Sequence, residues 1–342
     1  MKTQEQTGNW IYITPIYKLE ISNELKGEFQ IGRVVFVSRK KIPYIRKRLG
    51  FPSVFSLINK DYPSKDFFEE SKTFAFLQFQ GIPKEKEYEC RELIEEAVNI
   101  LSFSQLGYTS RRNNSQFGFI KQRGIVRNYI LNRNEFKGTL NNEVESKVLP
   151  FRLDENWRKF HDSFFFFDLV SIISSSKKMQ KKWKDTIIRA AVMAGKSMSS
   201  RDIEFSFLWN MIIVEMLLTE QGDKYSDSLP ERAESFIGWV GYWKEKKFEE
   251  KIRSAYKKRC QFVHDGNSQN IEVEDVLFTD DLVFNLMWNI VKHIDIFPTK
   301  KSVIEFSEKV KAEKLLNIKS KTQPKTLRFM NRETDSNELS RI

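Results

Sequence analysis

The sequence predicts an α+β domain followed by an all-α helical bundle. Strand-like segments, rich in β-branched and aromatic residues with turn residues around them, occur only in the first part of the chain. From Asp154 onward the pattern is helical almost throughout. The length of 342 residues fits about two domains of roughly 150 residues each. We therefore expect an α+β domain at residues 1–150, a helical bundle at 154–318 and a mobile tail at 319–342.

Three strands and two helices are expected in the α+β domain. The strands lie at residues 9–21, 27–38 and 73–81, and the helices lie at 40–50 and 86–103. A polar segment, SRRNNSQFG, follows the second helix and is expected to be a loop of the same domain.

The bundle is expected to contain seven helical segments with glycine or proline stops between them. The segments lie at residues 157–175, 179–195, 201–220, 229–241, 244–264, 279–294 and 302–318, and the stops are Gly195, Gly222, Gly241 and Pro298. The stretch Phe205–Leu218 is apolar almost all the way round, which is typical of a helix enclosed by others. Its carboxylate, Glu215, would therefore lie in a low-dielectric setting.

Composition and charge restrict the class of protein. A hydrophobic content of 40% and 29 phenylalanines allow sizeable cores, and the net charge of +11 favours a phosphate-rich partner such as RNA. The two cysteines, Cys90 and Cys260, have no metal-type spacing, so we expect neither a disulfide framework nor a zinc site. The apolar stretches at 163–173 and 205–218 are too short to span a bilayer. A cytoplasmic protein without a membrane segment is predicted.

An arginine and a histidine near the end of one predicted helix form the candidate site. On a helical wheel Arg259 lies in the middle of an apolar face, and that face is made by Phe248, Ile252, Ala255, Phe262 and Val263. A guanidinium cannot deprotonate, so a position turned inward requires an anion or several acceptors. Glu215 is the natural partner and would orient Arg259.

His264 follows Arg259 by five residues, which on an ideal helix is about 140° round and about 7.5 Å along. The two side chains are therefore not on one face. They can converge on one phosphate if the helix ends near His264, as Asp265 and Gly266 suggest, or if a second copy of the chain completes the site.

One guanidinium and one imidazole suit RNA cleavage by the neighbouring 2′-hydroxyl, which needs neither a metal nor a cofactor. His264 can take or return the proton, and Arg259 can stabilise the extra negative charge of the transition state. Lys257 and Lys258 lie directly before the arginine and would bind phosphates of the RNA.

The motif resembles a known family. Arg259, four intervening residues and His264 match the R-x4-6-H motif of HEPN domains, and the order FLWNMIIVEMLL, LPERAESFIG, YKKRCQFVHDG is similar to the Apea-like HEPN branch. The resemblance covers roughly residues 155–300. The chain differs from the family pattern by Cys260 straight after the arginine and by Asp265 between the histidine and the glycine.

The resemblance implies a dimeric, metal-independent endoribonuclease of antiphage defence or a toxin system, which cuts host or viral RNA such as tRNA. Arg259 and His264 would be catalytic, with Glu215 and Arg232 supporting them. The first domain would sense a phage-derived trigger, select the substrate or restrain the nuclease, and a regulatory partner protein would fit the same role.

Other interpretations of the same residues remain open at this level. His264 fits a solvent-exposed residue at a helix C-terminus, and Arg259 with Glu215 fits a purely structural pair. Arg232 fits an arginine that bridges helices of the bundle. His161 and His293 fit packed or exposed single residues. The rival function is a non-catalytic module for dimerisation and for binding RNA or protein, and a third is one half of a toxin pair whose partner is a nucleotidyltransferase.

Overall fold

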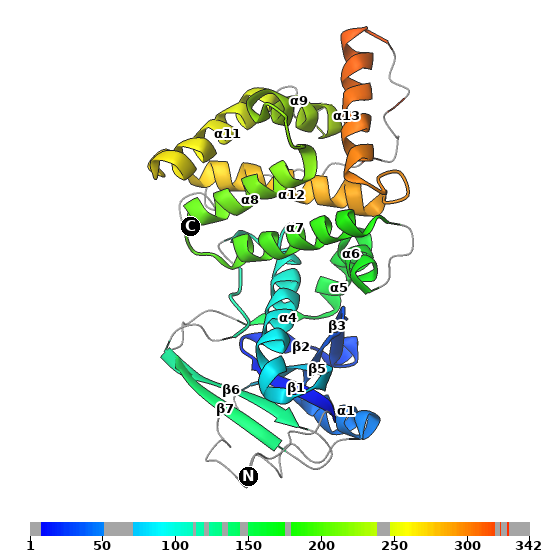
Figure 1. Ribbon diagram of the computed structural model, residues 1–342, viewed down its shortest axis with the longest axis vertical. Coiled ribbons are helices and arrows are strands. Elements are labelled where there is room, and N and C mark those ends of the chain that lie inside the picture. The colour runs from blue at the N-terminus through cyan, green and yellow to red at the C-terminus, as the bar shows by residue number, and fades with distance from the viewer. Residues whose placement is uncertain are drawn as a thin grey trace. The chain divides into compact units, whose positions relative to one another are not determined.

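The computed structural model describes residues 8–50, 71–111, 114–119, 123–131, 136–143, 150–174, 179–237, 247–318, 322 and 327. The chain divides into two compact units. The first consists of residues 1–101 and 114–161, and the second consists of residues 102–113 and 162–342. A small antiparallel sheet is thus followed by a helical region, as the sequence predicts (Figure 1).

The first unit is built on a six-stranded antiparallel sheet with the strand order β3-β4-β5-β1-β6-β7. Its strands are β1 Gly8–Ile16, β3 Glu28–Ile31, β4 Val34–Ser38, β5 Thr73–Gly81, β6 Arg123–Leu131 and β7 Phe136–Glu143. Two short strands, β2 Leu19–Ile21 and β8 Phe151–Leu153, pair in parallel as a separate ribbon. The described residues of this unit also form the helices α1 Ile42–Leu49, α4 Pro83–Phe103 and α5 Glu155–Ser163 and the 3₁₀ turns η1 Asn23–Leu25 and η2 Arg39–Lys41.

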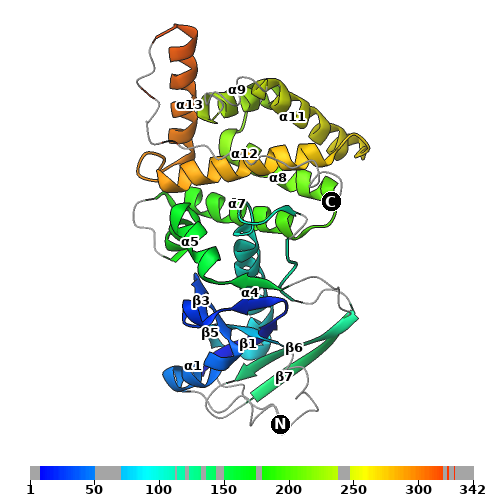
Figure 2. The same cartoon turned by 180° about the vertical axis from the view of Figure 1, so that it is seen from behind.

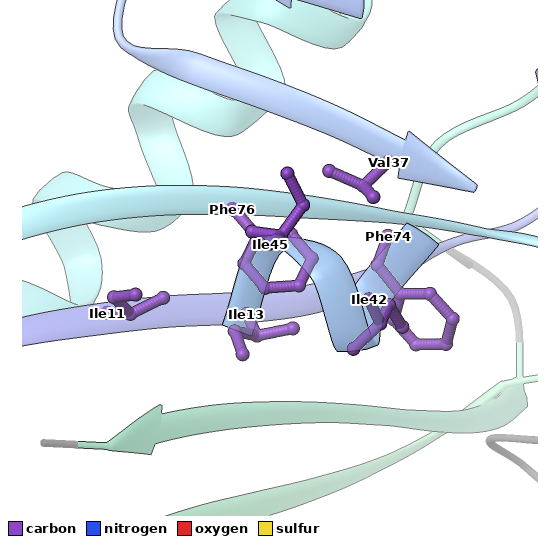
Figure 3. Close-up of a cluster of buried hydrophobic side chains, with 7 residues drawn as sticks. All are labelled: Ile11, Ile13, Val37, Ile42, Ile45, Phe74 and Phe76. Carbon is purple, nitrogen blue, oxygen red and sulfur yellow. The ribbon is translucent and has the colours of Figure 1, made fainter. Parts of the chain in front are cut away.

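Alternation along the central strands builds part of the core of the first unit. β1 and β5 pair along their whole length, from Gly8 with Gly81 to Ile16 with Thr73. Alternate side chains of β1 and β5, together with one from β4, cluster with α1, and Figure 3 shows this cluster, which contains Ile11, Ile13, Val37, Ile42, Ile45, Phe74 and Phe76. Burying one such isoleucine stabilises the fold by about 1.5–3 kcal/mol.

The sequence located β1, β4 and β5 but did not predict two hairpins. The strand expected at 9–21 is interrupted because Lys18 has a left-handed backbone with φ 55°. The segment expected at 27–38 is a hairpin of β3 and β4 that turns at Gly32, where φ is 55°. The β6–β7 hairpin, visible in Figures 1 and 2, was not expected. The sequence of β7, FKGTLNNE, contains glycine and asparagines, which are depleted in strands.

The second unit is helical. Its helices are α6 Phe166–Ser174, α7 Lys181–Ser199, α8 Ile203–Leu218, α9 Tyr225–Ile237, α11 Phe248–Asp265, α12 Val273–Lys292 and α13 Lys300–Leu315. α8 lies at the centre and packs against α7, α9, α11, α12 and α13. The prediction that α8 is enclosed is confirmed for most of its length, although Phe205 near its start is 49% exposed.

Several predicted helix boundaries are wrong. Gly195 does not stop a helix, because it is buried inside α7, which continues to Ser199. The segment expected at 157–175 is two helices, α5 and α6. α12 begins at Val273, because Glu272 and Asp275 form a capping box that starts the helix before Thr279. The expected stop at Gly241 lies outside the described residues.

The predicted mobile tail at 319–342 lies outside the described residues except for Thr322 and Leu327. Leu327 is buried, and the hydroxyl of Thr322 donates a hydrogen bond of 2.6 Å to Glu313 of α13. At these two positions the tail contacts the rest of the protein.

Arg111 gives the segment 102–113 its place in the second unit. Its guanidinium donates two hydrogen bonds of 2.7 Å to the carboxylate of Asp280 and further bonds to Ser197 and Ser206. The Arg111 side chain is only 5% exposed. The sequence predicts that Arg111 lies in a loop of the first domain at residues 110–118, because a polar run is typical of a surface loop, and residues 114–118 do belong to the first unit. Instead Arg111 is buried, with acceptors from three helices satisfying its donors.

Candidate functional site

Glu215 lies near the C-terminal end of α8 and is buried. The residue is 8% exposed, as expected for a side chain on an enclosed helix. Burial raises the pKa of its carboxyl, and the neighbouring Arg259 opposes this shift. A carboxylate in such a place stays ionised only with a cation beside it.

Arg259 of α11 supplies that cation. Its Nη2 donates a hydrogen bond of 2.9 Å to Oε2 of Glu215. Nε lies 2.8 Å from Oε1, but the two atoms are not aligned for a hydrogen bond. The side chains are 19% and 10% exposed respectively. The pairing expected from the sequence is therefore present, and it uses the Nε–Nη2 edge of the guanidinium.

The apolar face of α11 is shorter than the helical wheel predicts. Phe248, Ile252 and Ala255 are buried. Phe262 is half-buried and lies edge-on to Phe205 of α8, with 5.8 Å between the ring centroids. Val263, which the wheel assigned to the same face, is 48% exposed. The buried part of this face therefore ends before the last two turns of α11.

α11 ends just after His264, as expected from Asp265-Gly266. Gly266 has a left-handed backbone with φ 66°, and its N–H donates to the carbonyl of Phe262. This bond is that of an αL cap, and the N–H of Asn267 also donates to the carbonyl of Gln261. His264 is exposed in this last turn. Within one chain it points away from the side of α11 that carries Arg259, because five residues turn a helix by about 140°.

Arg232 of α9 bridges helices. Its guanidinium donates a 3.0 Å hydrogen bond to the carbonyl of Leu218, at the end of α8, and others to Asp223 and to Glu308 of α13. Burial would raise the pKa of Asp223, but the hydrogen bond from Arg232 holds it below its ordinary value. Arg232 therefore bridges helices, which was the alternative interpretation of this residue. Its bond to Leu218 fixes the end of α8, the helix that carries Glu215.

The two lysines before Arg259 differ. Lys257 is exposed. Lys258 is half-buried, and its Nζ lies 2.6 Å from Oδ2 of Asp275, in the first turn of α12. Lys258, which was expected to bind phosphate, is therefore already paired with a carboxylate. The sequence hid this partner because α12 was expected to begin at Thr279, beyond Asp275.

Tyr256 was missed by the sequence analysis and lies beside the ion pair. Burial raises the pKa of its phenol to about 12, and a hydrogen bond shared with Cys260 and the charge of Glu215 act in the same direction. The sequence could have indicated this neighbour, because Tyr256 precedes Arg259 by three residues and Cys260 by four on the same helix. Tyr256 is thus a neutral hydroxyl near the guanidinium, and Cys260, half-buried, is a free thiol.

The remaining histidines do not join the site. His161 is buried in the first unit, with 4.8 Å between its ring centroid and that of Trp157. His293 follows α12, and its backbone N–H donates to the carbonyl of Asn289. In the described part of the chain, His, Cys, Asp and Glu side chains do not gather in groups of three or more that could hold a metal ion.

Comparisons with protein-family models, curated proteins and solved structures give no match to this chain. Among the residues that the structure describes, every helix is too short or too polar to cross a bilayer.

Proposed function

We propose that the protein is a metal-independent endoribonuclease of the HEPN type, with Arg259 and His264 as its catalytic pair. One observation carries the proposal. An inward arginine, held by a buried glutamate, and an exposed histidine lie within the last two turns of one helix. A fixed cation suits charge stabilisation at a phosphate, and an accessible imidazole suits proton transfer.

In the proposed reaction the 2′-hydroxyl of the RNA attacks the adjacent phosphorus atom. His264 accepts the proton of that hydroxyl, and the bond from phosphorus to the 5′-oxygen breaks. The leaving 5′-oxygen takes a proton from water and His264 returns its proton to solvent, so the products are a 2′,3′-cyclic phosphate and a 5′-hydroxyl. Arg259 stabilises the phosphorane charge with the guanidinium edge that Glu215 does not use. DNA lacks the attacking hydroxyl and would not be cut.

A second copy of the chain would complete the site. His264 and Arg259 of one chain lie on different sides of α11, so one phosphate cannot readily contact both. Beside His264 lies an exposed apolar patch that contains Phe205 and Val263, 49% and 48% exposed, with Phe262 in contact with Phe205. Such a patch favours a self-complementary interface, in which the histidine of one protomer would approach the arginine of its partner.

Purified full-length protein incubated with total RNA tests the proposal. We expect fragments that end in 2′,3′-cyclic phosphate, no inhibition by EDTA, and at least about a hundredfold loss of rate in His264→Ala. Arg259→Lys should also be inactive, because lysine lacks the planar fork. Gln269→Ala changes an exposed side chain just beyond the same helix and is the matched control. A His264→Ala protein as active as the wild type would exclude the catalytic assignment.

The dimer has its own test. Val263→Asp should turn a dimer into a monomer, seen by light scattering after size exclusion, and should abolish cleavage while the helical signal is retained. A wild-type protein that is monomeric and active would exclude the shared site. Where a dimer forms, mixing His264→Ala with Arg259→Lys protein should restore part of the activity if each site takes one residue from each protomer.

A non-catalytic module for dimerisation and for RNA or protein binding is the second candidate. The pairs of Arg259 with Glu215 and of Lys258 with Asp275 favour it, because both cations are already neutralised. In that case RNA would be bound without being cut. The resemblance further implies a role in antiphage defence or as a toxin, with a trigger or a partner protein acting through the first unit. Expression in a bacterium should then arrest growth in a manner that requires His264.

A further inference from the structure

The stretch from η2 through α1 in the first unit is strongly basic. Residues 39–50 contain six lysines and arginines and no aspartate or glutamate, and the basic residues are Arg39, Lys40, Lys41, Arg46, Lys47 and Arg48. Three of them lie in the last turn of α1, where they are favoured by the helix dipole. The helix dipole explains why basic residues are favoured at this end of α1, but it does not say what they bind.

The two faces of α1 are clearly separated. Ile42 and Ile45 are buried against the sheet, as Figure 3 shows. The opposite face exposes Tyr44, Lys47 and Arg48, which share that face because they are spaced by three and four residues. Tyr44 is 58% exposed, and Nζ of Lys41 lies 5.5 Å from the centroid of its ring. An aromatic ring is therefore presented to solvent among cations.

The charges of this face are only weakly compensated. Arg48 lies 3.4 Å from Glu28, but both side chains are well exposed, at 43% and 35%. An exposed pair of this kind contributes about 0–1 kcal/mol and gives way readily to a stronger anion. Lys40 and Lys47 are exposed and have no hydrogen bond or ion pair among the described residues.

A second exposed tyrosine of the same unit provides the contrast. Tyr88 of α4 is 71% exposed, and its phenol is acted on by Glu92 and by the oppositely charged Arg91. A hydrogen bond to the carboxylate of Glu92 raises the pKa of the Tyr88 phenol. Tyr88 thus lies among charges of both signs, whereas residues 39–50 around Tyr44 contain cations and no carboxylate.

We propose that the exposed face of α1, made by Tyr44, Lys47 and Arg48 with Lys40 and Lys41 beside it, binds single-stranded nucleic acid. A base would stack on the ring of Tyr44, and the cations would bind the phosphates on either side. This combination of ring and cations fits a strand better than a duplex, whose bases are already stacked. An anionic membrane fits less well, because the apolar face of α1 is buried in the core and cannot enter a bilayer.

The inference does not depend on the proposed nuclease, since binding at α1 involves neither Arg259 nor His264. Where both hold, the first unit would capture the strand that the second unit cuts. A short oligodeoxynucleotide separates the two proposals, because it can stack and bind through its phosphates but lacks the 2′-hydroxyl that the proposed cleavage requires.

Fluorescence anisotropy of full-length protein with a labelled single-stranded oligodeoxynucleotide tests the inference. We expect Tyr44→Ala to weaken binding by about tenfold, the effect of losing one stacked base. Tyr88→Ala, the matched control in surroundings of mixed charge, should bind like the wild type. Because both rings are exposed, neither change disturbs the core, and far-UV circular dichroism verifies the fold.

The cations are tested by salt dependence. Each phosphate contact to a single strand contributes about 0.7 to the slope of log K against log salt, so Lys47→Gln with Arg48→Gln should lower the slope by about 1.4. The control Lys84→Gln, an exposed lysine at the start of α4, should leave the slope unchanged. Absent binding by the wild type, equal losses in Tyr44→Ala and Tyr88→Ala, or tighter binding to phosphatidylserine vesicles than to the oligonucleotide would each overturn the inference.

Discussion

Replacing Arg259 by methionine should make the stability of the protein depend on pH in a way that can be calculated from Glu215. The substitution retains most of the apolar stem and removes the guanidinium. The carboxyl of Glu215, 8% exposed, then has no cation against it. Arg259 is the group that opposes the burial-driven rise of the Glu215 pKa, so in the variant this pKa rises further.

The size of the effect has an upper limit, because a buried carboxylate without a cation can take up a proton. From an ordinary pKa of 4.5, protonation at pH 7 spans 2.5 units, which at about 1.36 kcal/mol per unit costs about 3.4 kcal/mol. At pH 5.5 the same limit is about 1.4 kcal/mol. Because the pKa of Glu215 is higher in the folded variant than in the unfolded chain, this residue destabilises the fold at pH values above the unfolded pKa. The destabilisation disappears as the pH falls towards the unfolded pKa. The stability gap between wild type and variant should therefore narrow by up to about 2 kcal/mol between pH 7 and 5.5.

Urea denaturation followed by far-UV circular dichroism, which reports mainly helices, measures this gap at both pH values. Adding Glu215→Gln to Arg259→Met removes the titrating group, so the gap between the double variant and Glu215→Gln alone should not change with pH. The reasoning is refuted if the gap of the single variant is independent of pH, or if the double variant keeps the dependence.

Three further changes have defined outcomes in the same denaturation experiment or in thermal melts. Arg111→Met leaves the fully buried Asp280 without its cation and should cost about 3–5 kcal/mol, so an unchanged midpoint would show that this pair does not hold the segment. Tyr12→Phe removes a buried hydroxyl that has no hydrogen-bond partner among the described residues, and should raise the stability by about 1 kcal/mol. Gly107→Ala should lower the melting temperature, because φ is +84° there and a Cβ would lie 2.7 Å from the ring of Phe284; a melt equal to the wild type would contradict this.

The helical unit could largely be predicted from the sequence because its helices are amphipathic or wholly apolar. The period of 3.6 residues located α8 and α11, and it identified Glu215 as the enclosed carboxylate that Arg259 meets. Helix ends were less predictable. Gly195 has the form of a stop signal, but a buried position in α7 favours a small residue, and packing outweighs the intrinsic cost of glycine, about 1 kcal/mol.

Long-range partners were beyond the reach of sequence periodicity. Arg111 lies in a polar run, and its partner Asp280 is 169 residues away, so only the folded chain brings them together. Lys258 and Arg232 likewise have the composition of surface cations, while Asp275 and Asp223 neutralise them in the structure. A pattern of charges along one chain gives the number of cations but not which of them remain available to a ligand.

That distinction bears on how the proposed site would work. Arg259 is fixed by an ion pair, and Arg232 fixes the end of α8 that carries the carboxylate, so the guanidinium would need little reorganisation to meet a phosphate. His264 has the opposite surroundings, an exposed position in the last turn before Gly266. If Glu215 were instead protonated, its hold on Arg259 would be reduced to a neutral hydrogen bond. RNA cleavage should therefore fall as the pH becomes acidic enough to protonate Glu215, and Glu215→Gln should remove this dependence.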